Sequence, residues 1–100
     1  MAELCLTLLC RPAIEEKLLD LLLMSPITTV FTSRPAAAHG LFLGNLSQAE
    51  QVRGRAVATE IQVIFAAADK TALLDTIRRQ CAGTTIHYWL TTLIEAGEIE

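Results

Sequence analysis

The spacing of apolar and polar residues along the chain predicts strands and helices in alternation. Residues 3–10 alternate, with leucine at every second position, as in a strand that buries one face strongly. Pro12 suits the first position of a helix because it has no N–H to lose there, and apolar residues then recur at helical spacing. Ser25 and Pro26 are expected to end this helix. The chain therefore begins with a strand followed by an amphipathic helix.

The middle of the chain predicts two further strands and a second helix. Residues 27–33 form a β-branched run, and such side chains fit a pleated sheet better than a helix. Residues 35–54 contain scattered glycine, proline, asparagine and serine, which predicts a long connecting loop. Alternation resumes at Arg55 and predicts the longest strand. Asp69 is a suitable N-cap for the next helix, and Gly83 lies where a C-cap glycine is expected.

A last strand over residues 85–93 completes the order βαββαβ. Right-handed crossovers then place both helices on one face of a four-stranded antiparallel sheet, which is an α/β (α+β) sandwich of the ferredoxin-like class. Two helices cover only one face of such a sheet. According to which side each strand gives to the helices, the other face would present one of two apolar sets: Leu9, Ala56, Ala58 and Ile64, or Trp89 and Leu93.

Composition adds the expectation of assembly. The chain has 100 residues, 52% of them hydrophobic and 19% charged, with a mean hydropathy of +0.42. This length predicts a single domain, residues 1–100, with one core. A small chain this apolar exposes more apolar surface than a monomer usually tolerates, and burial between subunits removes that surface. We therefore expect a homo-oligomer.

Charge and cysteine content exclude several classes of protein. The net charge of −3 gives no attraction to nucleic acid or to an anionic membrane, because both select clustered Lys and Arg. No apolar stretch approaches the ~20 residues that a membrane span requires. Cys5, Cys10 and Cys81 have no CxxC spacing, which argues against a disulfide framework or a structural zinc site. We expect a cytoplasmic protein with no nucleic-acid partner, no membrane insertion and no cofactor.

Four local motifs fall within this predicted fold. They are Leu9-Cys10-Arg11-Pro12-Ala13-Ile14-Glu15-Glu16-Lys17-Leu18-Leu19-Asp20, Phe31-Thr32-Ser33, Ala38-His39-Gly40 and Glu50-Gln51-Val52-Arg53-Gly54-Arg55. Together they resemble a small bacterial family of unknown function in the PII (nitrogen regulatory protein) superfamily, whose genes often lie beside those of heavy-metal efflux pumps. The resemblance spans nearly the whole chain. It implies a PII-like homotrimer with the sheets facing a central core, and a long loop comparable to the T-loop that PII proteins insert into their targets.

The chain departs from PII proteins where those proteins bind nucleotide phosphates. PII proteins use a glycine-rich loop before the last strand and the arginines of a terminal R-I-R-T-G-E motif. Here residues 82–84 form a short loop, and Leu93 and Glu95 occupy the arginine positions. Leucine offers phosphate no hydrogen bond, and a carboxylate repels it. The resemblance therefore does not extend to nucleotide binding in the PII manner.

The candidate residues for ligand or partner binding lie in and beside the long loop. They are Arg34, His39, Gly40, Glu50, Gln51, Arg53 and Arg55. Arginines gathered at a subunit cleft would bind a small anion such as a carboxylate, phosphate or bicarbonate, whereas the simpler interpretation is that they are solvated strand ends. His39 is the candidate metal ligand. Because zinc and copper need several converging N or S ligands, a hydrogen-bonding role within the loop is the simpler interpretation.

Nothing in the sequence indicates catalysis. Acylphosphatases share the topology but bind phosphate with a glycine loop after the first strand, where this chain has Cys10-Arg11-Pro12. No nucleophile has a base beside it. We predict a non-catalytic PII-like signalling or adaptor protein that binds a partner through residues 35–54, with a membrane heavy-metal efflux system as the partner that the resemblance implies. The alternative is a metal-binding accessory protein of a metal-resistance system, which would use His39 and the cysteines.

Overall fold

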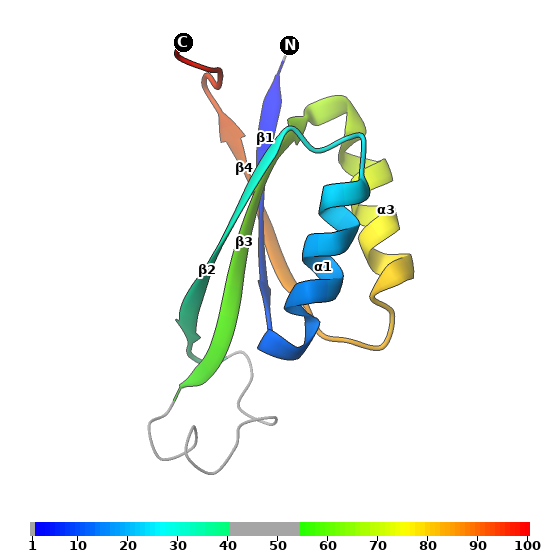
Figure 1. The fold of residues 1–100 in the computed structure, drawn as a ribbon, viewed down its shortest axis with the longest axis vertical. Helices are drawn as coiled ribbons and strands as arrows, with labels where there is room; N and C mark the ends of the chain where they lie inside the picture. The colour runs from blue at the N-terminus through cyan, green and yellow to red at the C-terminus, as the bar shows by residue number, and fades with distance from the viewer. Residues whose placement is uncertain (1, 41–54) are drawn as a thin grey trace.

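The structure, a computed structural model, describes residues 2–40 and 55–100 and shows the predicted order of elements (Figure 1). The elements are β1 (Glu3–Cys10), α1 (Pro12–Met24), β2 (Val30–Ala38), β3 (Ala56–Ala66), the single 3₁₀ turn η2 (Ala67–Asp69), α3 (Lys70–Gln80) and β4 (His87–Leu93). Within the described residues, α1 and α3 lie side by side on one face of the sheet, and no described helix covers the other face (Figure 1).

The four strands form one antiparallel sheet in the order β2-β3-β1-β4. β1 is central and pairs with β3 on one side and β4 on the other, so β2 and β4 are the two edge strands. Each helix connects two strands that are not neighbours in the sheet. This is the ferredoxin-like arrangement, and the predicted fold class is confirmed.

The core lies between the helices and the covered face of the sheet. Alternate residues of β1 and β3 meet the apolar stripes of α1 and α3 there, as the periodicity predicts. Burying each large side chain of this kind stabilises the fold by roughly 1.5–3 kcal/mol, which holds both helices on the same face. The buried set is Leu6, Leu8, Cys10, Leu18, Leu22, Ile61, Val63, Phe65, Leu73, Leu74, Ile77 and Cys81.

The strand register shows which residues the helices leave uncovered. Cross-strand partners share a face of the sheet, and Leu9 pairs with both Glu60 and His87 while Thr7 pairs with both Gln62 and Trp89. The two apolar sets that the sequence presented as alternatives therefore lie together on one face. Leu9, Ala56 and Ala58 are buried there with Ala38, whereas the Trp89 side chain remains 44% exposed.

Large apolar side chains remain at the surface in several places. They are Leu23, Met24, Val30, Val57, Tyr88, Trp89, Ile94 and Ile99. Within the described residues, no helix has the length and apolar character needed to cross a membrane.

The start of β2 is later than predicted. The strand begins at Val30, not at residue 27, because the Thr28 hydroxyl donates to the Leu22 carbonyl at 2.9 Å and to the Ser25 carbonyl at 3.3 Å. These hydrogen bonds hold residues 25–29 as the turn that follows α1. The β-branched run thus contains Thr28, whose side chain stabilises a turn. Strand propensity alone does not indicate this role.

The end of β2 is also later than predicted. Pro35 was expected to open the long connection, but residues 35–38 pair with β3 down to Ala38–Ala56. Proline is tolerated because β2 is an edge strand with one unpaired side. The rest of the predicted 35–54 loop begins at His39, and residues 41–54 lie outside the described part of the chain.

The second helix and the last strand show two smaller differences. Asp69 is the N-cap residue of α3, as predicted, but its side chain makes no capping hydrogen bond. Gly83 has φ +85°, which confirms a left-handed residue after the helix. β4 begins at His87, not at residue 85, because the Thr84 hydroxyl donates to the Cys81 carbonyl at 2.6 Å and extends the turn.

Candidate functional site

The end of the β2–β3 hairpin projects past the rest of the sheet. The last pair of β1 is Cys10–Thr59, and three more β2–β3 pairs follow it, between residues 36–38 and 56–58. At ~3.4 Å per residue these pairs extend the hairpin by roughly 10 Å. Figure 1 shows this end lying beyond both helices. The described residues that the sequence singled out lie along this hairpin.

Arg34 is already paired with a carboxylate. Its Nη2 lies 2.8 Å and its Nε 2.9 Å from Oε1 of Glu60, the residue directly opposite it on β3. The side chains are 72% and 15% exposed, so this ion pair adds little to the free energy of unfolding. A ligand anion at Arg34 would have to compete with Glu60. The sequence-based prediction of Arg34 as an anion ligand did not include its ion pair with Glu60.

Arg55 lies beside a shallow hollow at the hairpin end. The hollow has a volume of about 340 Å³, and of the described residues that line it only Arg55 is charged. The lining residues are Pro35, Ala36, Ala37, Arg55, Ala56 and Val57. Their side chains are small, so space for an anion remains next to the guanidinium. Arg34 is not part of this lining, so the structure separates the two described arginines that the sequence grouped.

The remaining predicted site residues fall into two groups. His39 and Gly40 follow β2 directly; His39 is exposed, and Gly40 has φ +80°, a backbone conformation that favours glycine. Glu50, Gln51 and Arg53 lie outside the described residues. Within residues 2–40 and 55–100, no three His, Cys, Asp or Glu side chains come together to hold a metal ion.

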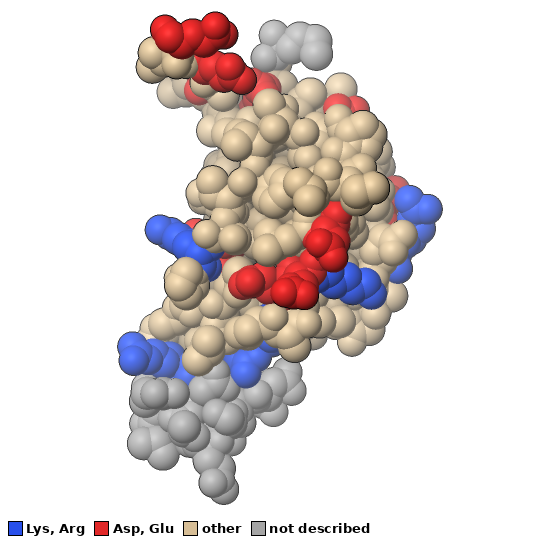
Figure 2. Space-filling view, viewed as in Figure 1, with Lys and Arg blue, Asp and Glu red and all other residues tan. Residues whose placement is uncertain are grey.

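Charged side chains are distributed unevenly over the surface. Figure 2 shows basic side chains at the end of the molecule where β3 and α1 begin, and acidic side chains gathered over α1. An anion approaching this face meets positive charge first at that end. This charge distribution would favour an anion at that end of the molecule over one on α1.

A part-buried polar contact ties β3 to α1, and sequence reasoning missed it. The Thr59 hydroxyl donates to Oε1 of Glu15 at 2.6 Å, and Thr59 is buried. Burial, then the charge of Glu15 and the nearby Cys81, raise the pKa of Cys10 to about 11, and burial also raises the pKa of Cys81. Both thiols are therefore neutral at physiological pH. The sequence did offer one sign of the contact between Thr59 and Glu15: Thr59 is a polar residue at a core-facing position of an alternating strand.

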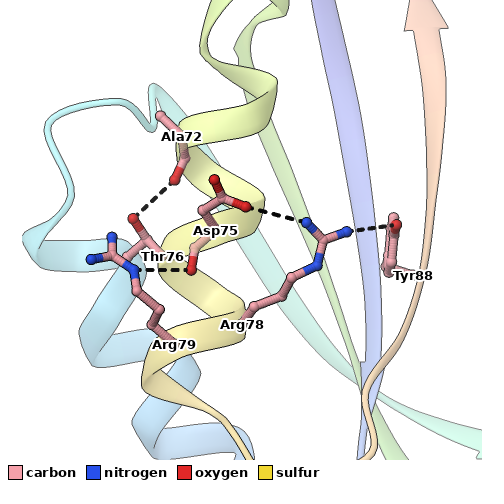
Figure 3. Close-up of polar contacts among 6 residues, drawn as sticks. All are labelled: Ala72, Asp75, Thr76, Arg78, Arg79 and Tyr88. Atoms are coloured by element: carbon pink, nitrogen blue, oxygen red, sulfur yellow. Dashed lines mark hydrogen bonds and ion pairs between the residues drawn. The ribbon is translucent and has the colours of Figure 1, made fainter.

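A second missed contact links α3 to β4. Arg78 extends from α3 toward β4, where its Nη2 donates to the Tyr88 hydroxyl at 3.3 Å, while its Nη1 lies 3.3 Å from Oδ1 of Asp75 (Figure 3). Neighbouring Arg79 instead donates through Nε to the Asp75 carbonyl at 3.4 Å. Arg78 and Tyr88 border a small cavity under α3. No local motif marks this pair, because the two residues meet only when α3 packs on the sheet.

Solved structures share this fold. A PII-like nitrogen regulatory protein from Thiomonas intermedia K12, CPII, bound to ADP, AMP and bicarbonate, superposes with a TM-score of 0.71 at 14% identity, covering 99% of this chain and 98% of that one. A putative PII-like signalling protein from Thermus thermophilus has a TM-score of 0.66 at 11% identity, covering 93% of this chain and 88% of that one. The fold is therefore that of PII-like proteins.

The whole chain matches one family. Residues 1–100 match the model of DUF3240, described as a protein of unknown function, and the chain belongs to this family. The crystal structure of a DUF3240 family protein from Shewanella baltica OS155 has a TM-score of 0.81 at 18% identity, covering 100% of this chain and 99% of that one. No curated protein matches the chain. The predicted membership of a family of unknown function with a PII-like fold is confirmed, whereas the gene neighbourhood with heavy-metal efflux pumps stays a prediction.

Proposed function

We propose that the protein is a non-catalytic PII-like signalling or adaptor protein that binds a partner through residues 35–54 under the control of a small anion. The observation that carries this proposal is the β2–β3 hairpin, which projects past β1 and brings His39, Gly40 and Arg55 to its exposed end. A paired stem presents whatever follows it at a distance from the body of the fold. This geometry suits contact with a partner protein better than it suits an enclosed active site.

The ligand class that we propose is a small anion held at the hairpin end. Arg55 lines a hollow of about 340 Å³ whose other described lining residues carry no charge, so none of them would compete with an anion for a bidentate contact to its guanidinium. CPII was solved with ADP, AMP and bicarbonate bound, which makes these three compounds the first to test. Leu93 and Glu95 at the PII arginine positions favour bicarbonate over a nucleotide in this chain.

The assembly that we propose is a homotrimer in which the sheet faces without helices meet. This face carries Trp89 at 44% and Val30 at 50% exposure, and burial of both in an interface would stabilise the assembly. Sedimentation velocity of the full chain tests the mass. Trp89→Glu should shift the trimer toward monomer, whereas Leu23→Glu, on an exposed position of α1, should leave the mass unchanged. A monomeric wild-type chain would contradict the trimer.

The partner that we propose is a membrane heavy-metal efflux system, and the place of action is the cytoplasm. The family resemblance supports both. Replacement of residues 41–54 by a short Gly-Ser linker keeps β2 and β3 and removes the segment between them. Pull-down of a detergent-solubilised heavy-metal efflux complex should be lost with this variant. Equal recovery of the complex by the variant and the wild type would refute the adaptor function.

The ligand is tested separately by isothermal titration with bicarbonate, ADP and AMP. Arg55→Met should weaken bicarbonate binding, because it removes the charge while keeping an unbranched side chain of similar length. Lys70→Met, a charge removal on α3 away from the hairpin, is the matched control and should bind as the wild type does. Unchanged affinity in Arg55→Met would show that the anion binds elsewhere.

A further inference from the structure

The cavity between α3 and β4 has a different chemical character from the hollow at the hairpin end. It encloses about 230 Å³ beneath the last turns of α3. β4 and β2 are the opposite edges of the sheet, so this cavity and the hairpin hollow lie on opposite sides of the molecule. Its floor is apolar, formed by side chains that are each at most 8% exposed: Leu8, Leu74, Ile77 and Cys81.

The mouth of the cavity carries a single positive charge. Of the described residues that line it, only Arg78 is charged, and its guanidinium stands beside the Tyr88 hydroxyl (Figure 3). The two polar contacts that Arg78 makes with described residues are each 3.3 Å long, whereas charge-assisted hydrogen bonds typically measure ~2.7–2.9 Å. Asp75, the partner in one of them, is itself 55% exposed and does not line the cavity. Arg78 therefore keeps donors for a stronger acceptor at the mouth.

The floor offers no competing charge. Burial raises the pKa of Cys81, which keeps this thiol neutral, and the Thr84 hydroxyl already donates to the Cys81 carbonyl at 2.6 Å. An apolar floor beneath one guanidinium and one phenol selects a molecule with an apolar tail and one anionic head. At ~30 Å³ for a water-sized group, the volume holds about eight non-hydrogen atoms.

We infer that this cavity binds a small monocarboxylate whose aliphatic tail fills the apolar floor while its carboxylate bonds to Arg78 and Tyr88. The carboxylate of the ligand takes the place of exposed Asp75 beside Arg78. It forms two hydrogen bonds with the guanidinium, where Asp75 makes one long contact. This site is separate from the hairpin end and does not rest on the proposed signalling function. Either can fail while the other stands.

The test is an NMR titration of the full-length protein with 4-methylpentanoate, which has eight non-hydrogen atoms. Saturable shifts should appear at Ile77, Cys81 and Tyr88. The alcohol 4-methylpentan-1-ol, which lacks the charge, and glutarate, which lacks the apolar tail, should each bind at least about tenfold more weakly, because a hydrogen bond to a charged group changes affinity by that factor or more.

Two variants separate the site from general attraction of anions. Arg78→Met should weaken 4-methylpentanoate binding about tenfold or more. Arg79 is the adjacent charged residue of α3 and does not line the cavity. Arg79→Met should therefore bind 4-methylpentanoate as the wild type does. The inference is overturned by no saturable binding to the wild type, by equal losses in both variants, by equal affinity for the alcohol, or by shifts centred on Arg55.

Discussion

Alkaline pH should destabilise the fold through the buried thiol of Cys10. This side chain is fully buried where β1 ends, and burial, the charge of Glu15 and the nearby Cys81 raise its pKa from 9.0 to about 11. Between these values the unfolded chain has released the thiol proton and the folded chain has kept it. The stabilisation from the neutral thiol is therefore fully present below pH 9 and is lost as the pH rises from 9 to 11.

The size of the effect follows from the pKa difference. Two pH units at about 1.4 kcal/mol each set a total loss of about 3 kcal/mol, of which about 1.4 kcal/mol is lost by pH 10. The pKa of Cys81 is also raised by burial, so its thiol acts in the same direction. A loss of this size is a substantial fraction of the stability of a 100-residue domain, about 5–15 kcal/mol.

Urea denaturation followed by circular dichroism, with reductant present and protein concentration fixed, measures this loss at pH 8, 9 and 10. Cys10→Ala should be less stable at pH 8 but should lose about 1.4 kcal/mol less than the wild type between pH 8 and 10. Cys5→Ala, on the other face of the sheet, is the matched control and should lose as much as the wild type. Parallel pH profiles for the wild type and Cys10→Ala would refute the reasoning.

Three substitutions test other parts of the fold by the free energy of unfolding in urea. Leu18→Ala, at a fully buried position of α1, should cost about 3 kcal/mol through lost burial and the cavity left behind, and a loss near zero would contradict its place in the core. Thr59→Val should cost about 1–3 kcal/mol because the part-buried hydrogen bond to Glu15 at 2.6 Å is lost, with no further loss when Glu15→Ala is added. Gly83→Ala should cost about 1 kcal/mol, since φ is +85° while space for a methyl group is open, and a neutral result would show that the turn relaxes freely.

The order and type of the elements were predictable because periodicity is strong in this chain. Alternation in β1 and β3 and helical spacing in α1 and α3 each extend over enough residues to distinguish strand from helix. The boundaries of β2 were not predictable from propensity. Its start depends on the hydrogen bonds of Thr28 to the end of α1, and its extension past Pro35 depends on the strand lying at the edge of the sheet.

The candidate site was predictable only in part, because its contacts depend on register and packing. Arg34 and Arg55 were identified by type and place in the chain, but the pairing of Arg34 with Glu60 follows from a strand register that no local pattern specifies. The meeting of Arg78 and Tyr88 requires α3 to lie over the sheet. Sequence therefore indicated which residues could act, and the packing of elements determined which of them meet.

The projecting end of the hairpin has a consequence for hydrogen exchange. Its three outermost strand pairs consist of five alanines and one valine, residues 36–38 and 56–58. Alanine has low strand propensity and contributes little apolar surface, so opening these pairs costs less free energy than opening the sheet beside β1. Protection of backbone amides from exchange should therefore rise along the hairpin, from the outermost pair, Ala38–Ala56, to the inner pair, Pro35–Thr59. A molecule that binds the hairpin end would shift this local opening equilibrium and slow exchange there while leaving the global stability of the core almost unchanged.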